Sequence, residues 1–187
     1  MNLGLASADM QVDVVHNPAY QALARIGFEY EIELVDAHGN VLSTQRAKNL
    51  YTTEGLNHLL GVELAAVAQI SSWYLALFEG NYTPTTADIG AAISAASTET
   101  NAFSNPTVRP PWTPSAAAAN GTINNYNNKA AFTFTATKTI YGGFLISTSQ
   151  VGSTTGVCIS AVRFGSPVVV NTGSVINVGA GCTLASA

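Results

Sequence analysis

The clearest pattern in the sequence is an alternation of apolar and polar residues over residues 26–36. Its apolar side consists of Phe28, Tyr30, Ile32 and Leu34, and three glutamates occupy the other side. Such a period of two predicts a β-strand with one buried face. Residues 36–40 (DAHGN) are typical of a turn, and residues 41–47 are strand-like again. The pattern therefore predicts a β-hairpin.

Leucines at helical spacing follow the hairpin, which predicts a helix with one apolar face. Thr53 is suited to cap its first turn, and the carboxylate of Glu54 suits the positive end of the helix. The residues that we expect to pack against the rest of the domain are Leu56, Leu59, Leu60, Leu64 and Val67. Residues 73–78 are typical of a short buried strand, and residues 86–96 can form a second short helix.

The second half of the chain has the pattern of an all-β structure. Residues 101–114 contain four prolines, so this segment cannot be a central strand and is expected to be extended, at the surface or beneath a neighbour. Gly142 and Gly143 predict a bulge. Further strands are predicted at residues 122–126, 131–137, 140–147, 158–164, 168–170, 174–178 and 179–186. Short strands at this spacing favour an antiparallel β-sandwich or barrel.

The first 25 residues are different, because they show no clean period and include Pro18. We therefore divide the chain into an extended N-terminal arm (1–25) and a single β-sandwich domain (26–187). Met10, Val12, Val14 and Val15 make the arm too apolar for a solvated tail. Tyr20 adds an amphipathic anchor. We expect the arm to cross another subunit rather than fold back on its own domain.

Composition excludes several classes of protein. Charged residues make up 10% of the chain and hydrophobic residues 47%, which excludes a disordered chain. Seven basic residues are too few for a nucleic-acid surface. We expect no membrane span, since polar residues interrupt the longest apolar stretch. We also expect no signal peptide, because Asp9 and Asp13 stand where a basic run is needed.

Charge is unevenly distributed along the chain. All eleven acidic residues lie between Asp9 and Glu99, whereas residues 100–187 carry four basic residues and no acid. Chance in a chain with so few charges is one explanation. The alternative is an assembly in which the acidic half of one copy meets the basic half of its neighbour.

No constellation of residues indicates catalysis. The sequence lacks nucleophile-elbow, phosphate-loop, dinucleotide-binding and CxxC motifs. Glu54 and His58 share a helix face, but no second histidine completes a metal site, and a surface pair is favoured. Cys158 and Cys182 are expected to be small buried residues, although a bridge between neighbouring strands is possible. We therefore expect no enzyme activity, no cofactor and no metal.

Several segments, taken in order, resemble a known family. They are NLYTTEGLNHLL (49–60), WYLALF (73–78), RPPW (109–112), AFTF (131–134) and IYGGFL (140–145). In this order they are similar to virion structural proteins of tailed bacteriophages, especially short-tailed ones. The resemblance covers roughly residues 26–187. It implies a jelly-roll-like β-sandwich that acts as a capsid decoration, or cement, protein on the capsid surface of a virion assembled in the host cytoplasm.

This resemblance implies two partners, the major capsid protein and further copies of the same chain. The residues expected at these interfaces are Met10, Val12, Val14, Val15, Tyr20, Arg109 and Trp112. Local packing is an equally good interpretation for Trp112, while Trp73 is expected in the core. Two alternatives stay open: a tail or neck component, such as an adaptor or fibre-attachment protein, and a carbohydrate-binding or receptor-binding module.

Overall fold

The alternating segment folds into the predicted hairpin. A computed structural model describes residues 25–49 and 51–185. β1 (Arg25–Val35) pairs antiparallel with β2 (Val41–Asn49), and the apolar side of β1 is buried. The Asp36 carboxylate closes the turn by accepting hydrogen bonds from the backbone N–H groups of His38 and Asn40. Local alternation and one polar turn are therefore sufficient to form these two strands.

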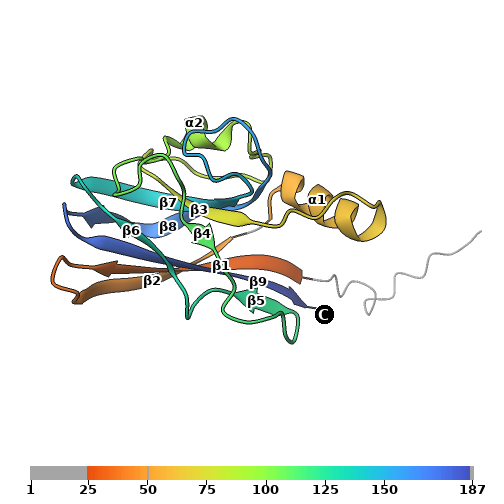
Figure 1. Cartoon of the computed structure of the whole chain (residues 1–187), viewed down its shortest axis with the longest axis horizontal. Helices are drawn as coiled ribbons and strands as arrows, with labels where there is room; N and C mark the ends of the chain where they lie inside the picture. Colours follow the sequence, from red (N-terminus) through yellow and green to blue (C-terminus); the bar gives the residue numbers. More distant parts are fainter. Residues whose placement is uncertain (1–24, 50, 186–187) are drawn as a thin grey trace, which may run out of the picture.

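The remaining strands complete two antiparallel sheets that pack face to face (Figure 1). In chain order the other elements are α1 (Thr53–Leu64), β3 (Trp73–Phe78), α2 (Ile93–Ser97), β4 (Pro111–Trp112), β5 (Thr122–Asn124), β6 (Ala130–Thr133), β7 (Lys138–Ile146), β8 (Cys158–Val170) and β9 (Val175–Ala185). Sheet A has the order β2-β1-β9-β5, with β6 also paired to β9, and sheet B has the order β4-β3-β7-β8. The predicted β-sandwich is confirmed, and its strand order is compatible with a jelly roll.

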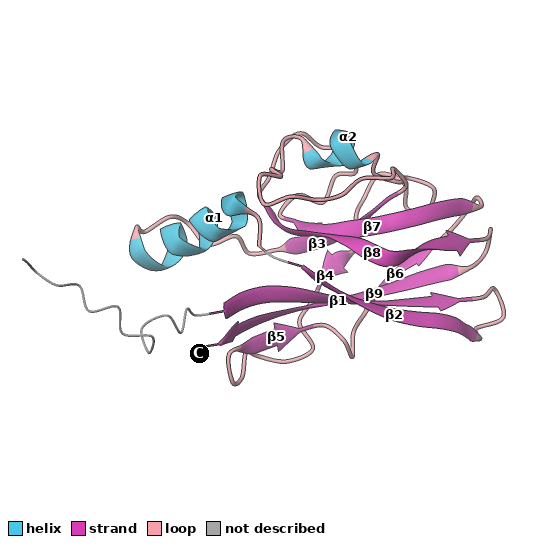
Figure 2. Cartoon of the chain, turned by 180° about the vertical axis from the view of Figure 1, so that it is seen from behind, coloured by secondary structure: helices cyan, strands magenta, loops and turns pink. Residues whose placement is uncertain are grey.

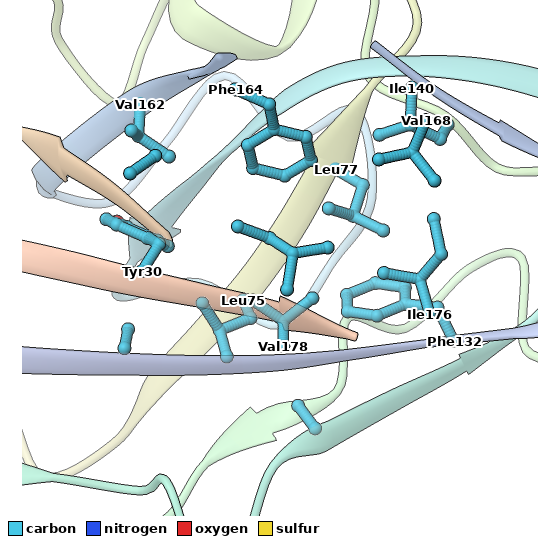
Figure 3. Close-up of a cluster of buried hydrophobic side chains, with 14 of the residues drawn as sticks. Tyr30, Leu75, Leu77, Phe132, Ile140, Val162, Phe164, Val168, Ile176 and Val178 are labelled. Atoms are coloured by element: carbon cyan, nitrogen blue, oxygen red, sulfur yellow. The ribbon is translucent and has the colours of Figure 1, made fainter. Parts of the chain in front are cut away.

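The main core lies between the two sheets, where their inward-facing side chains meet (Figure 3). Sheet A contributes Tyr30, Phe132, Ile176 and Val178, and sheet B contributes Leu75, Leu77, Ile140, Val162, Phe164 and Val168. The Tyr30 hydroxyl crosses the interface and donates a hydrogen bond of 3.2 Å to the Ser160 carbonyl. The sandwich thus has the apolar centre that its alternating strands require.

A third layer covers the outer face of sheet B. It consists of α2 and the loops around it, which lie above β7 and β8 in Figure 1. A second apolar cluster lies beneath this layer and includes Phe78, Ile93, Phe144 and Ile146, all fully buried. Sheet B is therefore buried on both faces, which explains why β3 is apolar along its length rather than alternating.

The predicted second helix is much shorter than expected and begins later, since α2 spans only Ile93–Ser97. The earlier residues form a loop around the Asp88 carboxylate. This carboxylate accepts hydrogen bonds from the Tyr82 hydroxyl and from the backbone N–H of Thr85. These bonds fix a loop conformation over residues 82–88, so the helical composition of the segment does not determine its structure.

Two predicted breaks in the last strands are absent. β8 continues through Pro167, and β9 continues through Gly179, so each forms one long strand where the sequence suggested two. Pro167 is tolerated because β8 is an edge strand and its ladder with β7 shifts register near Ile140. This irregularity lies next to the predicted bulge, but its extra residues are on β8, between Arg163 and Val168, and Gly142 and Gly143 are themselves in regular register. The last part of the chain therefore forms two long strands where four short ones were predicted, whereas β5 and β6 are shorter than predicted.

The N-terminal arm lies outside the described residues, apart from Arg25, which already belongs to β1. Its predicted interface residues, Met10, Val12, Val14, Val15 and Tyr20, therefore stay predictions. Among the helices that the structure describes, none has the length and apolar character needed to cross a membrane.

Candidate interaction surface

Helix α1 is attached to the sandwich through its first turn. The side chain of Thr52, rather than the predicted Thr53, caps the helix by accepting a hydrogen bond of 2.9 Å from the Gly55 backbone N–H. The Thr52 backbone N–H donates to the Ile159 carbonyl on β8. Gly55 is buried so close to β8 that a Cβ would lie 2.7 Å from the backbone of Ile159. This end of the helix is therefore held tightly on the sheet.

The rest of α1 projects beyond the end of the sandwich, as Figure 2 shows. Leu60 is 56% exposed and Leu64 is 81% exposed, while Leu56 and Leu59 are only partly buried. Val67, just after the helix, is 49% exposed. The prediction that Leu60, Leu64 and Val67 pack against the domain is therefore wrong. The helical spacing was correct as far as Leu64, where α1 ends, whereas Val67 lies beyond the helix, and nothing within the described chain covers this side. We call Leu60, Leu64 and Val67 the α1 surface.

An apolar groove of about 420 Å³ opens between the two sheets at the same end of the sandwich. Its lining residues include Phe28, Tyr51, Leu59, Trp73, Trp112, Ile123, Ile159 and Cys182, with Gln69 and Ser71 as polar neighbours. A smaller hollow behind α1 shares Leu59, Trp73 and Ile159 with it, so the groove continues along the base of the helix. The groove and the α1 surface thus lie at the same end of the domain, with Leu59 lining the groove and Leu60, Leu64 and Val67 outside it.

The two tryptophans of the chain form one wall of the groove. Trp73 on β3 pairs directly with Trp112 on β4. Trp73 was predicted in the core, but both indoles are only partly buried against it. The Trp112 indole N–H donates a hydrogen bond of 2.9 Å to the Ala180 carbonyl, which ties the short strand β4 to sheet A. Trp112 therefore packs locally and also lines a surface groove.

Arg109, which the sequence placed at an interface, lies inside the domain. Its side chain is fully buried and forms two parallel hydrogen bonds to the Glu99 carboxylate, at 2.7 and 2.8 Å. It also donates to the Thr148 carbonyl and the Ser94 hydroxyl. Its guanidinium lies 5.5 Å from the centre of the Phe144 ring. Arg109 has no exposed atoms for a partner and instead holds the outer loops on sheet B.

The uneven distribution of charge along the sequence is largely balanced within one chain. Arg109 pairs with Glu99, Lys138 with Glu79, and Lys129 with Glu31 and Glu33. The fourth basic residue of the second half, Arg163, donates to the Asn81 side chain and the Tyr82 carbonyl. Folding thus brings the acidic and basic halves together, and charge pairing between copies is not needed to explain the pattern.

Glu54 and His58 do not form the predicted surface pair. The Glu54 carboxylate accepts hydrogen bonds of 2.7 Å from the backbone N–H groups of Gly90 and Cys158. The His58 ring instead packs edge-on against Trp73. Within the described residues, no group of three His, Cys, Asp or Glu side chains is arranged to hold a metal ion.

The cysteines are free thiols on neighbouring regions of the two sheets. Cys158 is fully buried, as predicted, and burial raises the pKa of its thiol above the ordinary range. Cys182 is partly exposed in the groove, where its sulfur lies 2.8 Å from the Tyr51 hydroxyl. Burial also raises the pKa of the Cys182 thiol. Neither thiol has the lowered pKa of a nucleophilic cysteine.

A second apolar patch lies at the opposite end of the sandwich, near the β1–β2 turn (Figure 1). Val41, Leu42 and Val169 are 57%, 59% and 59% exposed. This patch adjoins a hollow smaller than the groove, lined by residues of β1, β2 and β8. Leu42 is therefore an exposed leucine far from α1, and a substitution there can serve as a control for substitutions on the α1 surface.

Comparisons with known proteins add no family assignment. No protein-family model matches this chain, and a search of curated proteins found no match.

Proposed function

We propose that this protein is a structural component of a bacteriophage virion. In this proposal it binds the outer surface of the capsid as a homo-oligomer and stabilises contacts between major capsid protein subunits. The sequence segments that resemble phage decoration proteins support the proposal. The sandwich fold is compatible with it. The observation that carries it is the exposed apolar surface of α1.

The α1 surface costs free energy while it faces water. Each Å² of apolar surface that becomes buried contributes roughly 25 cal/mol, and a leucine side chain contributes about 2 kcal/mol when fully buried. Leu60 and Leu64 lie on a projecting helix whose other end is held rigidly by Thr52 and Gly55. A rigid helix with an exposed apolar side is suited to fit a groove on a partner.

The charged groups of the domain support the same interpretation. Its buried ion pair and its surface pairs are formed within one chain, so they stiffen the domain and need no ligand. A protein that reinforces a shell gains strength from contact area repeated over many copies. The charges paired within the domain and the exposed apolar end together fit that requirement.

Attachment to capsids tests this proposal. The full chain is compared with the double variant Leu60→Asp and Leu64→Asp in binding to virions or shells that lack the protein. The matched control is Leu42→Asp, since Leu42 is as exposed as Leu60 but lies at the other end of the sandwich. We expect the α1 variant to lose attachment by at least tenfold and the control to bind normally. Equal binding of all three proteins would contradict the assignment of the α1 surface to the capsid.

A carbohydrate-binding module is a second candidate, favoured by one observation. Trp73 and Trp112 lie side by side in a concave site with Gln69 and Ser71 nearby. Sugar rings pack on aromatic faces, and neighbouring polar groups provide specificity. Trp112 already donates its indole N–H to Ala180, so this tryptophan can offer a sugar its ring face, while Gln69 and Ser71 provide polar groups nearby. Titration of oligosaccharides against tryptophan emission tests this candidate.

A further inference from the structure

The floor of the groove is a row of side chains that crosses sheet A. Phe28 on β1 pairs with Cys182 on β9, and Cys182 pairs with Ile123 on β5. The Trp73–Trp112 pair forms the wall on the sheet B side. None of the residues that line the groove is charged. Such an uncharged trough between two sheets is suited to an extended segment with one apolar side.

The N-terminal segment of the chain joins the sandwich at the mouth of this groove. β1 is paired with β9 as far as Arg25, which lies opposite Ala185 and only three positions before Phe28. Residues 1–24 precede it, and an extended segment of that length can span up to about 80 Å. Within it, Met10, Val12 and Val14 alternate with Gln11 and Asp13. Although the first 25 residues as a whole show no clean period, this alternation over residues 10–14 places their apolar side chains on one side of an extended segment.

We propose that the groove of one copy binds residues 10–14 of a second copy. Met10, Val12 and Val14 face the row formed by Phe28, Cys182 and Ile123, while Gln11 and Asp13 face solvent. The proposal rests on the homo-oligomer of the proposed function and specifies how its copies are joined.

The direction of β1 favours a second copy over the segment's own domain. Because pairing with β9 continues to Arg25, the backbone is still extended where it leaves the sheet at the mouth of the groove. A segment that continues in this direction moves away from its own groove and must reverse to enter it. The eleven steps from Val14 to Arg25 span roughly 35 Å when extended, enough to reach an adjacent copy. On a shell, neighbouring copies are held at a short distance, which raises the effective concentration of the segment.

Tryptophan emission of the full chain tests whether the segment occupies the groove. The chain has only two tryptophans, Trp73 and Trp112, and both line it. The double variant Val12→Asp and Val14→Asp places charge on the side that faces the groove. Its matched control, Gln11→Asp and Val15→Asp, places two charges on the opposite side. We expect emission at longer wavelength and loss of the oligomer for the first variant only. Unchanged emission and oligomeric state in both variants would overturn the proposal.

A disulfide test identifies which copy supplies the segment. Met10→Cys, Val12→Cys and Val14→Cys are introduced singly into the full chain and oxidised in the presence of the native Cys182. A covalent dimer that disappears when Cys182→Ser is added supports exchange between copies. A bridge formed within single chains, or no bridge from any of the three positions, would overturn it. Saturable sugar binding that shifts the emission of both arm variants and the native chain alike would assign the groove to carbohydrate instead.

These measurements use purified protein without capsids, so their results do not depend on whether the protein binds a capsid. If the protein attaches to virions but shows none of these changes, the exchange between copies is wrong and the capsid role stands. If the protein shows the exchange but binds no virion, the exchange stands and the capsid role is wrong.

Discussion

Arg109 and Glu99 form a two-fold hydrogen-bonded ion pair that is sealed inside the domain, with exposed side-chain fractions of 0% and 3%. The second Glu99 oxygen also accepts a hydrogen bond from the Gly152 backbone N–H. The pair therefore joins the α2–β4 segment, which contains both residues, to the β7–β8 loop that lies over sheet B. Desolvation makes such a pair a weak source of net stability, but removing only one partner leaves a buried charge without compensation.

Replacing both members of this pair should cost less than the sum of the two single replacements. Arg109→Met leaves the Glu99 carboxylate buried without its cation, and we expect a loss of about 3–5 kcal/mol in the free energy of unfolding. The double variant Arg109→Met and Glu99→Gln should lose clearly less than the two single variants together. Denaturant unfolding of the native chain, the two single variants and the double variant measures these losses. Strictly additive losses would show that the pair is not coupled as the geometry requires.

The exposed leucines of α1 should contribute little to the stability of the isolated protein. Leu60→Ala is expected to change the free energy of unfolding by less than about 0.5 kcal/mol, because the side chain is mostly exposed. Leu75→Ala, in the core between the sheets, should cost about 2–5 kcal/mol. Thermal and denaturant unfolding compare the two variants. A large loss for Leu60→Ala would mean that the helix packs on the domain after all.

Two glycines of the same helix should respond oppositely to alanine. At Gly55 the added Cβ would lie 2.7 Å from the Ile159 backbone, so Gly55→Ala should force α1 away from β8 and destabilise the protein by 1 kcal/mol or more, a rough estimate. At Gly61 the nearest atom belongs to the Val67 side chain, which is exposed and can move. Gly61→Ala should therefore be neutral or stabilising by up to about 1 kcal/mol. The melting temperatures of the two variants test this prediction. Equal effects of alanine at both sites would refute the close contact between α1 and β8.

The outer face of sheet A should lose stability in acid. The hydrogen bond from Lys129, with a further one from Arg46, lowers the pKa of Glu31. Since the unfolded pKa is about 4.3, ionised Glu31 stabilises the fold above that pH, and the contribution is lost as the pH falls through the lower folded value. Glu31→Gln should therefore cost about 1 kcal/mol at neutral pH and little at pH ~3.

The matched control for this pH dependence is Glu63→Gln. Glu63 is exposed on α1, and the described part of the chain offers it no ion pair. The free energy of unfolding should change little for this variant at either pH. A Glu31→Gln effect that is the same at both pH values would contradict the role of the Lys129 and Arg46 contacts.

Elements with a strong local pattern were predicted well. The hairpin of β1 and β2, the start of α1 and the strand β3 all follow from neighbouring residues. What covers an element was not predicted. The spacing of Leu56 to Leu64 shows that α1 has an apolar side, but the same spacing arises whether a sheet, a partner or nothing covers it.

The buried position of Arg109 was missed for a different reason. An arginine beside two prolines has the composition of an exposed loop, and its partners are distant in sequence: Ser94 lies in α2, Glu99 ten residues before Arg109, and Thr148 in the β7–β8 loop. The groove was missed in the same way, since Phe28, Cys182 and Ile123 meet only through pairing of strands that are distant in sequence. Trp112 was the one groove residue among those predicted at an interface, because tryptophan in a proline-rich segment is difficult to bury completely.

The proposed capsid role is tested most directly by the number of copies of this chain in a purified virion. Quantitative mass spectrometry against the major capsid protein gives this number. We expect several hundred copies, in a fixed ratio to the major capsid protein, because a decoration protein repeats with the symmetry of the shell. About a dozen copies or fewer, the number that a ring at the neck or tail provides, would contradict the account.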